Sequence, residues 1–350
     1  MDSQKLLKVV SVGGGTGLAC LLQGLKHGVY DPPILEPPAG SPWIGQLTAV
    51  VTVSDDGGSS GRLREELKVL PPGDIRNCMV ALSTDESLLS RLFQYRFPGQ
   101  GGLRGHSFGN LFLGALTGVT GDFLSALRVS SHVLAIRGTI FPSTLQDVQL
   151  KAWIADGTRL SGETTISRSA APILRVALSP AGCKAVPGVL EAIRNADVIT
   201  VGPGSLFTSL IPNLLVKGVV QAMRKSRAVK IYISNLMTQP GETTGLSAAD
   251  HLEAIHRHAG PGLFDGVILN NQPVPARVLA RYHRQGARTV PAELQRIRGM
   301  GLRIMQRPLL ARGSVVRHNP ARLAQAVQGA CARWQKAGKP ATNKSKATTI

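Results

Sequence analysis

A short apolar run, then a glycine-rich turn, then a helical pattern recurs along this chain of 350 residues. The unit occurs at 8–25, where KVVSV and GGGTG precede leucines at helical spacing, and at 197–225, where DVITV and GPGS precede a long apolar pattern. Strands that alternate with helices predict a parallel sheet covered by helices on both faces. We therefore predict an α/β fold with a mainly parallel sheet.

Four further apolar runs are predicted strands of this fold, at residues 47–53, 230–234, 264–270 and 301–308. A helix over 319–335 is predicted to close the folded part of the chain. Residues 138–180 differ, because they contain several short strand patterns and the hairpin signal Asp156-Gly157. We expect this segment to form a small β insertion.

The positive charge of the chain is concentrated near its C-terminal end. Residues 1–275 contain 24 basic and 20 acidic side chains, whereas residues 276–350 contain 16 basic side chains and one acidic, Glu293. Such an excess attracts nucleic acid or anionic membranes, but no aromatic stacking platform or known nucleic-acid motif accompanies it. We expect one domain over 1–335, a basic disordered tail over 336–350 and no nucleic-acid partner.

The four cysteines are widely spaced and form no CxxC pair, which argues against a structural zinc and a disulfide framework. The first residues lack the apolar region and cleavage site of a signal peptide. Residues 198–216 carry no charge, but prolines and glycines interrupt them, so we predict a buried strand, a loop and a helix start rather than a membrane span. These features favour a cytoplasmic protein.

Ligands of open parallel sheets bind outside the carboxyl ends of the strands, at the point where the strand order reverses. The glycine-rich loops follow strands, so we expect them to converge there. In the GGGTG loop the backbone can approach an anion, and the next helix offers free N–H groups. This loop matches neither the dinucleotide fingerprint nor a Walker loop, and a plain tight turn is the alternative. The candidate phosphate-binding residues are Gly13, Gly14, Gly15, Thr16 and Gly17.

Two further loops follow predicted strands. In GPGS, the Ser205 hydroxyl either caps the next helix or reaches a phosphate or ribose; Gly202, Pro203 and Gly204 precede it. The loop NLMTQPGETTG (235–245) is rich in donors and acceptors and reads as a specificity loop. The alternative is an ordinary loop in which Thr243 or Thr244 caps a helix. Its candidate ligand-binding residues are Asn235, Thr238, Gln239, Glu242 and Thr243.

The stretch SDDGGSSGRLREEL (54–67) combines acidic, small and basic residues after a predicted strand. Asp55 and Asp56 are the only credible metal ligands, suited to Mg²⁺, although two carboxylates do not complete a site. Ser59, Ser60 and Arg62 suit an anion, and a mere turn is the alternative. Arg64 is expected to pair with a neighbouring helix carboxylate, Glu65 or Glu66.

Three other polar residues lie in loops before helical patterns. His106 in GHSFGN is either a base or a satisfied structural residue, and Asn110 is a ligand candidate. Asp74 in LPPGDIRN is predicted to be a helix cap rather than a catalyst. We find no nucleophile elbow, activated cysteine or HExxH motif, so catalytic residues stay unassigned.

Seven stretches in order resemble the gluconeogenesis factor family of bacterial proteins. They are VVSVGGGTGL, TVSDDGGSSGRLR, LPPGDIRNCMVAL, HSFGNLFL, ADVITVGPGSLFTSLIPNLLV, ISNLMTQPGET and RHNPARLA, and they span about residues 8–327. The resemblance implies a Rossmann-like, doubly wound fold and a cytoplasmic protein linked to gluconeogenic growth, cell shape and envelope synthesis. It also implies binding of UDP-sugars, notably UDP-N-acetylglucosamine.

The family is related to the 2-phospho-lactate transferase of deazaflavin cofactor synthesis, which uses Mg²⁺. Two functions are therefore open. The favoured one is a regulatory protein that binds a nucleotide sugar without turnover, and the alternative is a Mg²⁺-dependent phospho-group or nucleotidyl transferase. No cofactor other than Mg²⁺ is implied, and a homo-oligomer is among the open assembly states.

Overall fold

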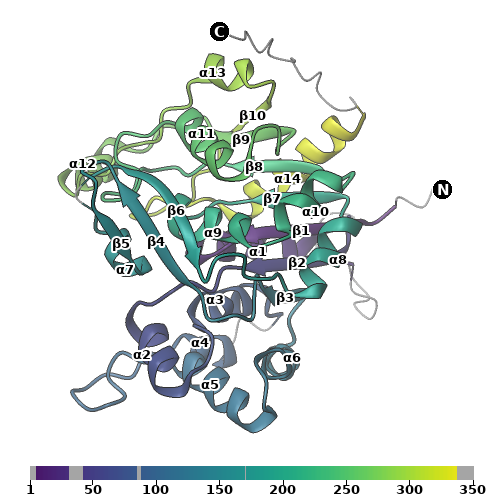
Figure 1. The fold of residues 1–350 in the computed structure, drawn as a ribbon. Coiled ribbons are helices and arrows are strands. Elements are labelled where there is room, and N and C mark those ends of the chain that lie inside the picture. Colours follow the sequence, from purple (N-terminus) through teal and green to yellow (C-terminus); the bar gives the residue numbers. More distant parts are fainter. Residues whose placement is uncertain (1–4, 31–41, 85–87, 170, 337–350) are drawn as a thin grey trace.

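The fold is built around one seven-stranded sheet in which every strand pairs with its neighbours in parallel. The structure is a computed structural model that describes residues 5–30, 42–84, 88–169 and 171–336. The strand order is β10-β9-β8-β7-β1-β2-β3 (Figure 1). The strands are β1 (Leu7–Gly13), β2 (Ile44–Val51), β3 (Thr139–Pro142), β7 (Val198–Val201), β8 (Val229–Ile233), β9 (Gly266–Asn270) and β10 (Arg303–Arg307).

Helices flank this sheet and cover its core. Among them, α1 packs against α3 and α14, while α8 packs against α10 and α9 against α11. The helices nearest the predicted loops are α1 (Gly15–Leu25), α2 (Gly58–Leu67), α3 (Gly73–Leu82), the π-helix η2 (Leu206–Leu210) and α11 (Ala248–Ala259). The others are the 3-10 turn η1 (Lys26–Gly28), α4 (Leu88–Gln94), α5 (Phe108–Thr120), α6 (Phe123–Val133), α7 (Glu163–Ile166), α8 (Pro187–Asn195), α9 (Ile211–Leu215), α10 (Val219–Lys225), α12 (Ala276–Arg284), α13 (Leu294–Gly299) and α14 (Pro320–Lys336).

The burial of the central strands explains why they read as unbroken apolar runs. Val9, Val10 and Val12 of β1 are at most 2% exposed, although successive side chains point to opposite faces of the sheet. A strand that is covered on both faces has no polar side. The prediction of a Rossmann-like, doubly wound α/β fold is confirmed.

The predicted β insertion over 138–180 is only partly correct. Its first strand, β3, lies in the main sheet and pairs in parallel with β2. The rest forms a separate antiparallel sheet of order β5-β4-β6, with strands β4 (Gln149–Ile154), β5 (Arg159–Ser161) and β6 (Ile173–Ser179). The hairpin signal is confirmed, since β4 and β5 flank Asp156-Gly157 and Gly157 has a φ of +88°. The local pattern identified the strands, whereas the pairing partner of β3 depends on β2, almost a hundred residues earlier in the chain.

The uncharged stretch 198–216 forms β7, a turn, η2 and α9, as predicted. Within the four described ranges, no helix combines the length and the apolar character needed to cross a membrane. Helix α14 reaches Lys336. Lys336 is the first residue of the predicted disordered tail 336–350 and is helical, while residues 337–350 lie outside the described residues.

Candidate functional site

The strand order reverses between β1 and β7, and two glycine-rich loops meet at this point. From β1 the chain proceeds to β2 and β3 on one side, and β7 to β10 occupy the other. A β-carbon added to Gly17, in the first turn of α1, would lie 2.4 Å from the carbonyl oxygen of Pro203. Only a residue without a side chain allows α1 to approach the loop after β7 so closely. The predicted convergence of these loops is confirmed.

One amide of the GGGTG loop already binds a carboxylate of the protein. The N–H of Gly15 donates to Oδ2 of Asp74 at 2.7 Å. Burial raises the pKa of Asp74 to about 6, while the Gly15 bond opposes this shift. The prediction that Asp74 caps α3 is wrong, because the residue before that helix is Pro72 and no side chain caps it. Asp74 instead joins the start of α3 to the loop after β1.

The predicted specificity loop is anchored to the loop after β7. The Asn235 side chain makes two hydrogen bonds to the backbone of Gly204. Its Oδ1 accepts from the Gly204 N–H at 3.0 Å, and its Nδ2 donates to the Gly204 carbonyl at 2.8 Å. Gln239 Nε2 donates to the hydroxyl of Ser205 at 2.7 Å. Ser205 makes no side-chain cap on the following helix, so its capping role is not realised. These bonds fix the loop beside the switch point.

Other polar residues of this loop make internal contacts. The buried Glu242 accepts the N–H groups of Phe207 and Thr208 through Oε1, at 2.7 and 3.0 Å, and so satisfies the start of η2. Burial raises the pKa of Glu242 to about 7, and these two bonds oppose the shift. Thr243 Oγ1 accepts the N–H of Gln239 at 2.8 Å, and Thr238 Oγ1 accepts from the N–H of Arg288 at 2.9 Å.

The alternative for this loop, a helix cap by Thr243 or Thr244, is not realised. Helix α11 is capped by Ser247 rather than by Thr243 or Thr244, and Thr244 Oγ1 accepts the N–H of Gly241. The Ser247 hydroxyl accepts the N–H of Asp250, whose carboxylate accepts the N–H of Ser247 in return. The threonines therefore shape turns within the loop and leave the helix end to Ser247.

A cleft of about 860 Å³ extends from the switch point between two walls. One wall comes from α3 and α4, and the other from the 235–240 loop, α12 and residues 311–318. Its size is within the range of small-molecule sites. Ten predicted ligand residues line it: Gly14, Gly15, Thr16, Gly17, Pro203, Gly204, Ser205, Asn235, Thr238 and Gln239. The geometry makes this cleft the candidate ligand site.

Several residues of the cleft received no role from the sequence. Two exposed cations belong to its lining, Arg91 on α4 and Arg317 before α14. His318 is 7% exposed, and burial lowers its pKa to about 4, so the ring is neutral at physiological pH. The remaining unpredicted polar residues of the lining are Cys20, Gln23, Lys26, Asn77, Ser90, Gln94, Tyr282 and Gln285. Their places depend on side-chain directions that only the assembled fold defines.

The stretch after β2 packs beside the switch point and does not line this cleft. Ser59 Oγ lies 3.0 Å from Nδ1 of His106 and accepts from Nδ2 of Asn110 at 3.1 Å. Ser60 Oγ accepts the N–H of Gly73 at 3.1 Å. The side chains of His106 and Asn110 and the backbone N–H of Gly73 thus occupy the hydroxyls of Ser59 and Ser60, so His106 has a structural contact here.

The two arginines of this stretch also contact the chain itself. Arg62 donates to the carbonyl of Arg104 at 2.6 Å. Arg64 donates to the carbonyl of Val148 and pairs with Asp147, rather than with Glu65 or Glu66 as predicted. Gly13 ends β1 and Gly202 follows β7, and neither lines the cleft. Ligand contacts by these residues stay predictions.

The paired aspartates are also engaged. Asp56 Oδ1 accepts the N–H and the hydroxyl of Thr164 at 2.9 and 2.8 Å, and Asp55 Oδ1 accepts the N–H of Gly57 at 2.9 Å. Glu163 lies close enough for Asp55 to raise its pKa, although burial is the larger cause. Over the described ranges, no group of three or more histidine, cysteine or acidic side chains is arranged to hold a metal ion. The donors present do not fit a complete Mg²⁺ site.

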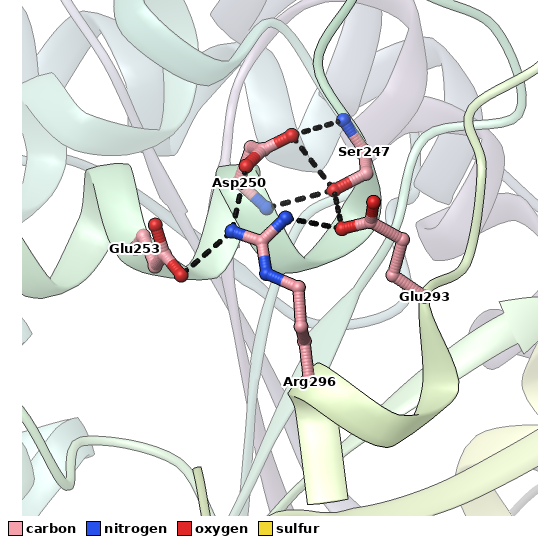
Figure 2. A network of polar contacts seen from close by, with 5 residues as sticks. All are labelled: Ser247, Asp250, Glu253, Glu293 and Arg296. Atoms are coloured by element: carbon pink, nitrogen blue, oxygen red, sulfur yellow. Dashed lines mark hydrogen bonds and ion pairs between the residues drawn. The ribbon is translucent and has the colours of Figure 1, made fainter. Parts of the chain in front are cut away.

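A polar network lies just after the C-terminal end of the 235–245 loop (Figure 2). Arg296 of α13 donates to Oδ1 of Asp250 at 2.9 Å, to Oε1 of Glu253 at 2.7 Å and to Glu293. The Ser247 hydroxyl donates to Glu293 or Asp250, which lie 2.7 and 2.8 Å away. Between α12 and α13, the chain pairs with the loop through the bridge Met237–Thr289. The network thus ties α13 to the N-terminal end of α11, just after the loop.

Comparison with known proteins places these features in a family. The family model described as 2-phospho-L-lactate transferase CofD matches residues 9–310. A putative gluconeogenesis factor of Nostoc sp. is 47% identical over 321 residues, which cover 91% of this chain and 67% of that protein. The gluconeogenesis factor of Bacillus subtilis is 43% identical over 318 residues, which cover 91% and 96%. A crystal structure of a Bacillus halodurans protein has a TM-score of 0.86 at 43% identity and covers 93% of this chain and 100% of the other.

Proposed function

Because the chain belongs to the family of 2-phospho-L-lactate transferase CofD and the bacterial gluconeogenesis factors, we propose that it binds a nucleotide sugar in the switch-point cleft. The ligand class is UDP-sugars, with UDP-N-acetylglucosamine as the first candidate. In this proposal the protein is a cytoplasmic regulator linked to carbon metabolism, cell shape and envelope synthesis, and it turns over no substrate.

The observation that carries the proposal is the meeting of two glycine-rich loops at one end of a cleft of about 860 Å³. The helix α1 directs its N-terminal end, with no capping side chain, into this junction. Backbone N–H groups at a helix start favour a diphosphate. Thr16 and Gly17 supply the amides that Asp74 does not occupy, and Arg91 and Arg317 in the cleft lining supply positive charge.

In this proposal the loop 235–240 contacts the uracil or the sugar and determines which ligand binds. Its Gln239 is held to Ser205 through Nε2, while Oε1 is buried and has no hydrogen-bond partner in the described part of the chain. A buried amide oxygen without a partner costs free energy, which a ligand donor would recover. A small rotation of this side chain would present the oxygen to the cleft.

Isothermal titration calorimetry with UDP-N-acetylglucosamine, UMP and GTP tests the proposal. We expect heat with the uridine ligands and none with GTP, and a loss of affinity of roughly tenfold in Gln239→Ala. Gln306→Ala, on β10 and outside the cleft, is the matched control and should bind as the wild type does. The absence of binding heat with every uridine nucleotide would contradict the proposal.

A phospho-group or nucleotidyl transferase is the second candidate, supported by the description of the matching family model. It requires turnover that depends on Mg²⁺ and is lost in Asp55→Asn. Incubation of the protein with nucleotides and with sugar or deazaflavin acceptors, followed by mass spectrometry, tests it. Intact nucleotides under all conditions would remove its support.

A further inference from the structure

Helix α12 lies at the periphery of the fold, and none of its residues is buried (Figure 1). Two contacts hold it to the following chain: Arg281 donates to the carbonyl of Ser314, and the Tyr282 hydroxyl accepts the N–H of Val316 at 3.0 Å. Residues 311–317 form a hairpin that the bond from Ala311 N–H to the carbonyl of Arg317 closes. We call α12, Arg288 and this hairpin the arginine surface.

Four exposed guanidinium groups of the arginine surface have no carboxylate partner in the described ranges. They belong to Arg277 and Arg284 on α12, to Arg288 just after it, and to Arg312 in the hairpin. Arg277 and Arg284 are two helical turns apart, so they lie on one face about 10 Å from each other along the axis. The surface thus presents a stripe of like charges.

The sequence around the surface supplies no counter-charge. Residues 276–336 contain twelve arginines and one lysine, and their single acidic residue is Glu293. Glu293 is already paired with Arg296 and bonded to Ser247. Unpaired like charges repel one another, and a partner that carries the opposite charge would relieve this cost.

The remaining side chains of the surface indicate the kind of partner. Val315 in the hairpin is 44% exposed, and Val278 and Leu279 on α12 are only half-buried. Arginine forks suit carboxylates as well as phosphates, but nucleic-acid binders of this type add aromatic platforms. Tyr282 is the aromatic residue of α12, and its hydroxyl is bonded to Val316. Charge together with exposed aliphatic groups favours a protein segment over a nucleic acid.

We propose that the arginine surface docks an acidic, amphipathic segment of a partner protein. Its Asp and Glu side chains pair with Arg277, Arg284, Arg288 and Arg312, and its aliphatic side chains cover Val278 and Val315. None of these four arginines lines the switch-point cleft. The docking test uses no nucleotide sugar, so its result does not depend on the proposed function.

Fluorescence anisotropy of a short labelled peptide of alternating glutamate and leucine tests the docking. The full chain should bind this peptide, and the charge reversal Arg277→Glu with Arg284→Glu should weaken binding at least about tenfold. The control reverses Arg128 and Arg333, which are exposed on α6 and α14 and give the same change in net charge. The control should lose less than about twofold. A lysine–leucine peptide should bind the Arg277/Arg284 variant better than the wild type.

Three outcomes would overturn the proposal. They are the absence of peptide binding, an equal loss in the control variant, which would show attraction to net charge alone, and tighter binding of a single-stranded oligouridylate than of the peptide. Thermal unfolding of both variants checks that the fold is intact, which we expect because α12 buries no side chain.

Discussion

The carboxylate of Asp74 lies 2.7 Å from the backbone nitrogen of Gly15, so the loop best placed to bind a phosphate already binds an anion of the protein. A β-carbon on Gly14 would lie 2.6 Å from the same carboxylate oxygen, which shows how closely α3 approaches this loop. A bound diphosphate would therefore meet a negative charge whenever Asp74 is ionised. With a pKa of about 6, Asp74 is ionised at physiological pH.

Removal of this charge is expected to strengthen the binding of an anionic ligand. Asn in place of Asp74 keeps an oxygen that accepts the Gly15 N–H, and the affinity for UDP-N-acetylglucosamine at pH 8 should rise by about tenfold. The gain should shrink at pH 5.5, where the wild-type carboxyl is itself mostly protonated. Calorimetry at both pH values measures this. Weaker binding at both would show that the carboxylate assists the ligand.

The close approach of α1 to the loop after β7 predicts that alanine substitutions at two glycines have opposite effects on stability. Gly17→Ala places a methyl group 2.4 Å from a carbonyl oxygen and should destabilise the fold by about 1–3 kcal/mol and abolish ligand heat. Gly118 lies exposed within α5, with open space around its α-carbon. Gly118→Ala should therefore stabilise the protein by about 0.5–1 kcal/mol. Urea unfolding compares the two; equal effects would refute the close contact.

The buried Glu242 predicts a pH dependence of stability. Its pKa rises from 4.5 to about 7 on folding, so the folded state holds a proton between these values that the unfolded state releases. The stability that Glu242 contributes is present below pH 4.5 and is lost as the pH rises through 7, by ~3 kcal/mol in total. Glu242→Gln retains an acceptor for Phe207 and Thr208 and removes the titration.

The measurement is the difference in unfolding free energy between Glu242→Gln and the wild type at pH 5 and pH 8. The unfolding free energy of the variant, relative to that of the wild type, should be higher at pH 8 than at pH 5. A comparison of variants is needed because His251 and His318 have pKa values lowered to about 4, and they oppose Glu242 as the pH falls below 6.5. A pH-independent difference would contradict the burial of an ionisable Glu242.

The network around Arg296 predicts that alanine substitutions at two arginines of α13 differ in their effect on stability. Arg296→Ala removes three carboxylate contacts and leaves Asp250, Glu253 and Glu293 without their cation (Figure 2). Arg298 is exposed on the same helix and pairs with no carboxylate of the residues that the structure describes. The unfolding midpoint should fall in Arg296→Ala and stay unchanged in Arg298→Ala. Because the network is partly exposed, high salt should reduce the difference; a salt-independent loss would point to packing instead.

Much of the fold could be predicted from the sequence, because buried parallel strands and glycine-rich turns have strong local patterns. The central strand β1 reads as an apolar run and ends in glycines at the switch point. The assignment of β3 to the insertion was wrong because no local pattern distinguishes Thr139–Pro142 from the short strands after it. Its parallel partner is β2, and several helices, from α2 to α6, separate the two strands along the chain.

The sequence predicts the part of the candidate site that is formed by close backbone contacts. It predicts less well the part that depends on the directions of side chains. The close contact of Gly17 with Pro203 follows from glycine alone. By contrast, polarity alone predicts ligand contacts for Glu242 and Ser59, yet both side chains make hydrogen bonds within the protein. Arg317 and His318 belong to a recognised motif, but their approach to the cleft depends on the path of the chain after β10.

The pairing of β1 has a consequence for synthesis on the ribosome. One edge of β1 pairs with β2 soon after it emerges, but the other edge pairs with β7, whose first residue is Val198. At bacterial and eukaryotic rates of elongation, this edge stays uncovered for roughly 10–40 s. An open apolar edge is prone to wrong pairing with another chain, so the nascent protein should be most dependent on chaperones before Val201 leaves the exit tunnel.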